Sequence, residues 1–296
     1  MTKSPLKSST PSQACAPMSP PSVPKPPLER AASPTSLPED SLRGGRLKVL
    51  TLACPDGRGQ AMAHLRLPTV GTATRAGLVI LPPFGEEGNR ARRFLAHLAR
   101  LLAARGIASL LLDLSGNGES PQTRAPLRIA EWFAEIDSAV KRLAASAEQS
   151  VPTAIFGMRH GGMVAAERHR CAPAGGPDQG LILFDVPPEP VGGRLARVRR
   201  RLFSDPAGLP PLDDGAHTCL HDPELIHYVS RIPVIPVPSD ESDVPDPANP
   251  SAVHRLAGST CAPPVWAQRE ALVPAELLLA LAHRLESILV QEGSAQ

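Results

Sequence analysis

The sequence has few aromatic residues, no long apolar run and almost no net charge. Only 3% of the residues are aromatic, so alanine, leucine and valine must supply most of the hydrophobic core. No run approaches the roughly 20 apolar residues of a membrane-spanning helix, and no apolar segment follows Lys3 and Lys7 to form a signal peptide. The net charge of +2 is too small to indicate nucleic-acid binding. We therefore expect a cytoplasmic protein with no membrane span and no nucleic-acid partner.

Motifs for metals, disulfides and dinucleotides are also missing. The cysteines at positions 15, 54, 171, 219 and 261 are odd in number, and no two have C-x-x-C spacing, which predicts reduced thiols. The stretch "HTCLH" (217–221) groups two histidines, but no H-E-x-x-H motif or cysteine pair orders them. The stretch "GMRHGG" (157–162) lacks the G-x-G-x-x-G spacing of a dinucleotide site. We expect no metal and no cofactor.

Proline, in contrast, is abundant, and its distribution divides the chain. Residues 1–43 are mostly Ser, Pro, Thr and Ala, which predicts a disordered tail because too little apolar surface offsets the entropy of ordering. Residues 44–296 form the predicted domain. Within it, residues of about 205–262 are Pro-rich and predict an irregular segment, since proline cannot donate to the hydrogen-bond ladder of a central strand.

Strand and helix patterns alternate from residue 45 onward. Apolar runs on either side of "DGRG" (56–59) predict an antiparallel hairpin. Continuous apolar runs predict buried strands at 76–84, 107–114, 151–156 and 180–186. Helical spacing predicts helices at 90–106, 129–146, 162–170 and 274–291, a short one at 222–230 and a basic one at 194–205. This alternation predicts an α/β fold whose mostly parallel sheet has helices on both faces.

The stretch "GMRHG" (157–161) is the main candidate for a functional site. It lies between a predicted strand and a predicted helix, which is the context of the nucleophile elbow G-x-S-x-G. The central position holds Arg159, and a protonated guanidinium cannot attack a carbonyl. The elbow's oxyanion hole depends only on backbone N–H groups, those of His160 and of Phe84 or Gly85.

Four stretches together carry a resemblance to a known family. They are "PPFGEEGNRARR" (82–93), "DLSGNGES" (113–120), "FGMRHGG" (156–162) and "APPVWAQRE" (262–270). In this order they resemble the second type of α/β-hydrolase-like family named exosortase A system-associated hydrolase. The resemblance covers residues 76–190 and, more loosely, 262–290. It implies an α/β-hydrolase-like sheet, and an arginine at the elbow of the family as well. Residues 190–260 look shortened and Pro-rich relative to that family, so we expect a sheet that is shortened after the sixth strand.

The resemblance also implies a setting for the protein. It points to Gram-negative bacteria with an exosortase system, which processes proteins with PEP-CTERM tails and accompanies exopolysaccharide genes. The implied partner is a protein of that system or a small anionic ligand.

A serine hydrolase also needs a catalytic base and an acid. The catalytic base belongs in the loop after the last strand, where residues 259–270 contain no histidine. His254 precedes that stretch and His283 lies within the predicted last helix. Candidate acids are Asp213, Asp214, Asp240 and Asp243, and their spacing selects none of them. Ser115 and Ser120 are either turn residues or substitute nucleophiles.

Two alternatives therefore stay open, one for the anion that faces Arg159 and one for the function of the chain. A guanidinium at a helix N-terminus suits a carboxylate or phosphate ligand, such as a C-terminal carboxylate or a sugar acid. Alternatively, Glu86, Glu87 or Asp113 pairs with Arg159 internally. The chain is then either a hydrolase-like enzyme with a non-standard site or a non-catalytic binding protein. The candidate ligand-binding residues are Arg159, His160, Phe84, Gly85, Glu86, Glu87 and Asp113.

Overall fold

The computed structural model describes most of the predicted domain. The described residues are 44–53, 60–121, 127–147, 150–172, 180–186, 222–237, 253–258, 264–267 and 273–293. The predicted disordered tail and the predicted basic helix at 194–205 lie outside these residues. So do the four candidate acids, Asp213, Asp214, Asp240 and Asp243.

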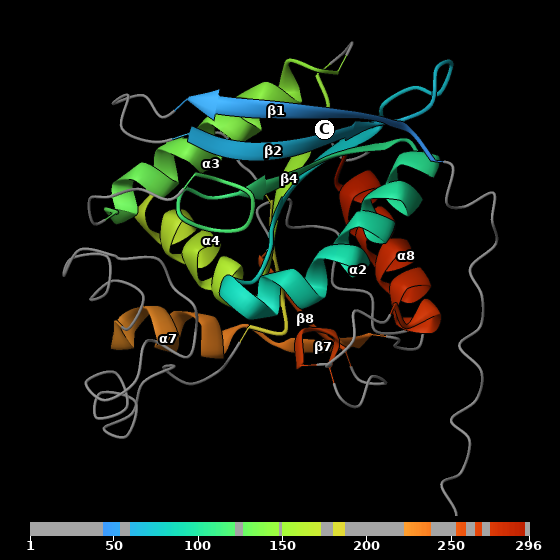
Figure 1. Ribbon diagram of the computed structural model, residues 1–296. Helices are drawn as coiled ribbons and strands as arrows, with labels where there is room; N and C mark the ends of the chain where they lie inside the picture. The colour runs from blue at the N-terminus through green and yellow to red at the C-terminus, as the bar shows by residue number, and fades with distance from the viewer. Residues whose placement is uncertain are drawn as a thin grey trace, which may run out of the picture. The chain divides into compact units, whose positions relative to one another are not determined.

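An eight-stranded sheet forms the centre of the described domain (Figure 1). Its strands are β1 (Arg46–Ala53), β2 (Gln60–Leu67), β3 (Ala76–Leu81), β4 (Ile107–Asp113), β5 (Thr153–Met158), β6 (Gly180–Phe184), β7 (Val234–Val237) and β8 (Val253–Gly258). The spatial order is β1-β2-β4-β3-β5-β6-β8-β7. Only the β1–β2 and β2–β4 pairs are antiparallel, so the predicted hairpin and the predicted parallel sheet are both confirmed.

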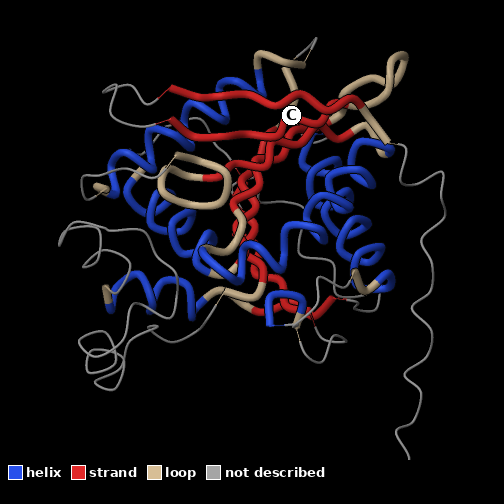
Figure 2. The backbone as a smooth tube through the Cα atoms, viewed as in Figure 1, coloured by secondary structure: helices blue, strands red, loops and turns tan. Residues whose placement is uncertain are grey.

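Helices cover both faces of this sheet, as predicted. One face packs against α3 (Ile129–Ala144), α4 (His160–Cys171) and α7 (Pro223–Arg231), and the other against α2 (Gly85–Ala104) and α8 (Ala275–Gly293). Figure 2 shows the strands as a band between these two groups of helices. Each face has its own apolar core, and the six residues of β3 are fully buried between the two. A strand covered on both faces accounts for the unbroken apolar run "AGLVIL".

The structure corrects the prediction for the Pro-rich segment. The prediction of an irregular segment over residues 205–262 is wrong for β7 and β8, so the sheet continues for two strands after the sixth. Within the same segment, α7 confirms the short helix predicted at 222–230. Pro236 is compatible with β7 because this strand lies at the edge of the sheet, where proline is tolerated. Helix α2 also begins at Gly85, five residues earlier than predicted.

Candidate functional site

The turn from β5 to α4 has the backbone of a nucleophile elbow. Arg159 lies between Met158 and His160, and its backbone has φ 53° and ψ −121°. Residues other than glycine rarely adopt this backbone conformation. Neighbouring glycines permit the sharp turn. A Cβ atom at Gly161 would lie 2.4 Å from the carbonyl oxygen of Pro82, and one at Gly157 would lie 2.5 Å from the Cα of Gly162. The glycines of "GMRHGG" are therefore required by close backbone packing.

The guanidinium of Arg159 pairs with Glu87. Its Nε lies 3.2 Å from Glu87 Oε2 and its Nη2 donates to Glu87 Oε1 at 3.3 Å, which is a two-pronged ion pair. The third nitrogen, Nη1, donates to the backbone oxygen of Asp185 at 3.3 Å. Trp266 covers the group, with its ring centroid 3.9 Å from Cζ of Arg159. The Arg159 side chain is 14% exposed and that of Glu87 is 27% exposed.

The other two candidate anions face different arginines. Glu86 pairs with Arg90 one turn along α2, at 3.3 Å. Asp113 binds Arg92 at 2.6 Å and is only 3% exposed. Of the three acids predicted as possible internal partners of Arg159, the structure therefore brings Glu87 alone to it.

Asp185 and Trp266 complete the site, and sequence reasoning selected neither. Asp185 follows β6, and its side chain accepts from the backbone N–H of Gly258 at 2.9 Å and from Trp266 Nε1 at 3.4 Å. Trp266 lies in η2 (Val265–Ala267), between β8 and α8. Burial raises the pKa of the Asp185 carboxyl above its ordinary value, against the opposing effects of these two hydrogen bonds and of Arg159.

The sequence nevertheless contains a feature that points to each of Asp185 and Trp266 as a site residue. Asp185 ends the apolar run "GLILF", so it lies at the carboxyl edge of a buried strand where ligand sites gather. Trp266 belongs to "APPVWAQRE", one of the stretches that carry the family resemblance.

Comparisons with known proteins agree with this architecture. Residues 72–186 match the family described as serine aminopeptidase, S33. This chain has an α/β-hydrolase fold. No curated protein matches its sequence.

The solved structures that match this chain are only distantly similar to it. A carboxyl esterase from Bacillus coagulans is 18% identical over 53% of this chain and 50% of its own, with a TM-score of 0.36. An esterase from Exiguobacterium antarcticum is 14% identical over 49% and 48%, with a TM-score of 0.38. The α/β-hydrolase GrgF from a Penicillium species is 14% identical over 84% and 99%, with a TM-score of 0.49. The chain spans about half the length of the two esterases.

Three side chains from separate segments, Arg159, Asp185 and Trp266, meet at the turn after β5. Arg159 occupies the elbow, Asp185 follows a central strand, and Trp266 lies between them with its N–H directed at the acid. An indole nitrogen donates a hydrogen bond but cannot accept a proton, and a guanidinium cannot act as nucleophile. These three side chains therefore hold and orient charge at the turn after β5.

His160 and Phe84 line the side of the site nearest α2. Their rings are stacked, with centroids 6.2 Å apart and an interplanar angle of 17°. His160 Nδ1 lies 3.8 Å from Glu87 Oε2, so the pair is ionic when the imidazole is protonated. Helices α2 and α4 both begin here, at Gly85 and His160, and two helix N-termini add partial positive charge. This edge of the sheet therefore favours an anion, which Glu87 supplies.

The two serines of the turn after β4 have structural partners. Ser115 donates its hydroxyl to the buried Glu135, and its backbone N–H also donates to that carboxylate at 2.9 Å. Ser120 donates to the backbone oxygen of Asp113 and accepts from the backbone N–H of Met62 at 2.7 Å. These contacts favour the turn role over that of a substitute nucleophile.

The described residues contain no group of three side chains suited to hold a metal ion. Nor does any helix in the described ranges have the length and apolar character needed to cross a membrane.

Proposed function

We propose that this chain is an α/β-hydrolase-fold protein of an exosortase and exopolysaccharide system that binds an anionic group through Arg159. The four stretches that resemble the exosortase A system-associated family support the setting. The observation that supports the binding role is the two-pronged pair of Arg159 with Glu87 at the elbow. In this reading Glu87 is an internal substitute for the carboxylate or phosphate of a ligand.

Exchange of Glu87 for a ligand is physically reasonable. The guanidinium is held in place by its strained backbone, by the Asp185 carbonyl and by Trp266, so it keeps its orientation when Glu87 leaves. Glu87 lies in the first turn of α2 and is 27% exposed, so rotation of its side chain returns the carboxylate to water at small cost. A carboxylate or phosphate can then use the same two donors.

Indole NMR signals provide a direct test, because the chain has only two tryptophans. In protein labelled with ¹⁵N at the indole, we expect the Trp266 signal, assigned with Trp266→Phe, to shift saturably with D-glucuronate, inorganic phosphate or N-acetylalanine. Glu87→Gln removes the competing charge and should tighten binding of the preferred probe about tenfold, as expected for a partly buried ion pair.

The chain offers a matched control for this experiment. Glu86 lies beside Glu87 in the same helical turn but pairs with Arg90, so Glu86→Gln should leave probe binding unchanged. Arg159→Met should abolish the shift. If none of the three probes moves the Trp266 signal in either wild type or Glu87→Gln, the anion-binding proposal is wrong.

A hydrolase with a non-standard site is the second candidate, favoured by the family match over residues 72–186. Labelling with a fluorophosphonate and mapping of the adduct separates the two functions. A serine adduct in the wild-type protein would establish a nucleophile and overturn the purely binding role. Esterase activity that is unchanged in Arg159→Ala and Arg159→Ser would place the reaction elsewhere in the molecule.

A further inference from the structure

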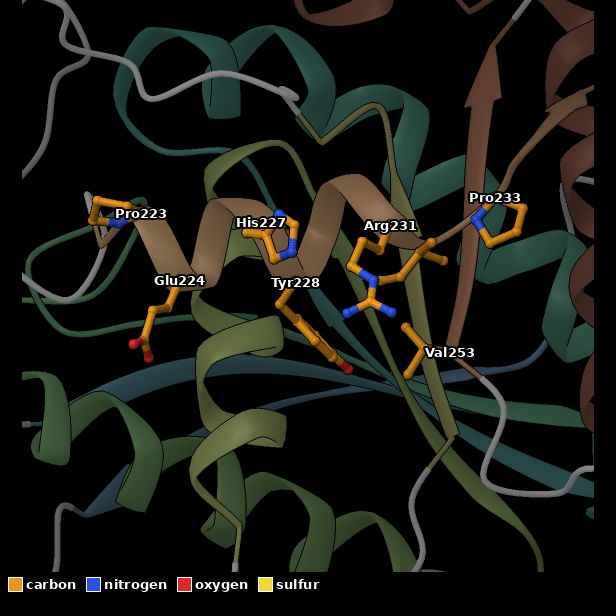
Figure 3. A pocket seen from close by; sticks show the side chains of 8 residues that line it. Pro223, Glu224, His227, Tyr228, Arg231, Pro233 and Val253 are labelled. Carbon is orange, nitrogen blue, oxygen red and sulfur yellow. The ribbon is translucent and has the colours of Figure 1, made fainter.

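A concave site lies along the outer face of α7 (Figure 3). The cavity has a volume of about 730 Å³, which is within the range of small-molecule sites. Leu225 and Val229 on the opposite side of α7 are buried in the core, so the helix is fixed and presents this face outward. None of the residues around Arg159 lines the cavity.

The floor of this cavity is apolar. Tyr228, Ile232 and Val253 line it and are each partly buried. Figure 3 shows the Tyr228 and Arg231 side chains extending from α7 toward Val253. Val253 begins β8, so it lies at the opposite end of the parallel strands from the edge that carries Arg159. The cavity is therefore a separate site.

The charged groups at its rim favour an anion. Arg231 and His227 are four residues apart on the same face of α7 and both are exposed. Glu224 is the acidic residue of the lining, and Arg170 of α4 binds it at 3.4 Å. Arg170 also pairs with Glu167 and Asp222, so the carboxylates gather at the Glu224 end of the cavity. Arg231 lies seven residues further along α7 and supplies positive charge at the other end. Burial raises the pKa of Tyr228, which keeps its phenol protonated as a hydrogen-bond donor.

We infer that this cavity binds a small amphipathic anion, an alkyl or aryl carboxylate. Its apolar part packs on Tyr228, Ile232 and Val253, and its carboxylate meets Arg231. An alkyl alcohol of equal length provides the same apolar contact but no charge, and acetate provides the charge but almost no apolar contact. The carboxylate with a chain should therefore bind more tightly than either.

Tyr228 is the only tyrosine of the chain, which makes a clean experiment possible. In protein labelled with 3-fluorotyrosine, the single ¹⁹F resonance reports on this cavity. We expect octanoate to shift it saturably, and octanol and acetate to bind at least tenfold more weakly. Arg231→Ala should weaken octanoate binding about tenfold, corresponding to about 1.4 kcal/mol, and Arg231→Lys should retain most of it.

Arg93→Ala is the matched control, because Arg93 is an exposed arginine of α2, on the other face of the sheet. It should leave octanoate binding unchanged. The inference is overturned if octanoate causes no saturable shift, or if octanol binds equally well and Arg231→Ala has no effect. It is independent of the proposed function, because the Trp266 and Tyr228 signals report on the two sites separately.

Discussion

Arg159 combines an unfavourable backbone conformation with a favourable set of side-chain contacts. Its φ of 53° and ψ of −121° lie outside the left-handed helical region as well as the usual regions for side-chain-bearing residues. The fold keeps this conformation because the tight glycine packing around the turn leaves little alternative. The pair with Glu87 and the contact with Trp266 then hold the guanidinium. A strained backbone and a charged side chain thus coincide at one residue, as is common at functional sites.

Two substitutions at Arg159 separate these contributions. Arg159→Ala removes the ion pair but retains the strained backbone, whereas Arg159→Gly removes both the pair and the strain. We expect Arg159→Gly to be more stable than Arg159→Ala by about 1–2 kcal/mol. Urea denaturation of the two variants measures the difference directly. Equal stability would show that the turn is not strained.

The buried carboxyl of Asp185 predicts a pH effect. Its pKa is raised from an ordinary value of 3.8, so the folded state favours the protonated form. The stability contributed by this group is therefore fully present below pH 3.8 and is lost as the pH rises through the raised pKa. In Asp185→Asn this loss is absent, so the stability of the variant relative to wild type should increase as the pH rises from 3.8 through the raised pKa. Unfolding free energies from urea titrations across this range test the trend, which a flat difference would contradict.

The residues of the site were predictable to different degrees. Arg159 and Glu87 could be named because each belongs to a local motif with a known place in the fold. Asp185 and Trp266 could not be selected in the same way, because their roles depend on contacts between segments 81 residues apart in sequence. A lone aspartate or tryptophan carries no information about such a partner.

At the level of elements, the apolar strands were easier to predict than the polar ones. The strand β8 contains His254 and Arg255, which are 6% and 8% exposed and interrupt the apolar pattern. The guanidinium of Arg255 donates to the backbone oxygens of Val229 and Val186, so a charged residue is accommodated inside the sheet by tertiary contacts. Such a strand does not differ in sequence from a loop.

The first turn of α4 packs closely against the end of β3, and this contact predicts the effect of adding a side chain at Gly161. Gly161 has no positive φ, but a Cβ atom there would lie 2.4 Å and 2.6 Å from the backbone oxygens of Pro82 and Leu81. Neither oxygen belongs to a flexible side chain, so Gly161→Ala should destabilise the protein by about 3 kcal/mol. Gly71→Ala is the comparison, because Gly71 has a φ of 87° and nothing within 4 Å of its Cβ position. It should cost about 1 kcal/mol. Thermal unfolding of the two variants compares their losses of stability. An equal loss in Gly161→Ala and Gly71→Ala would exclude a steric clash as the cause of the effect at Gly161.

At the level of the whole molecule, the sheet order decides which residues meet. The carboxyl ends of β3, β5 and β6 lie side by side, and the chain after β8 returns to the same edge. This brings together Glu87, Arg159, Asp185 and Trp266 from four separate parts of the sequence. The sequence pattern predicted the sheet that produces this edge, but the placement of η2 over the elbow required the structure.

The same arrangement predicts that hydrolase chemistry can be introduced with two substitutions. Arg159→Ser would place a hydroxyl on the elbow, and Trp266→His would place an imidazole beside it, within reach of the Asp185 carboxylate that now binds the indole N–H. The backbone oxyanion donors of the elbow do not depend on either side chain. We expect the double variant to react with a fluorophosphonate at position 159 at least about tenfold faster than either single variant, because nucleophile and base act as a unit. Arg159→Ser combined with Trp266→Phe is the control, since it has the hydroxyl and an aromatic ring but no base. Equal labelling of the two double variants would show that Trp266 does not occupy the position of a catalytic base.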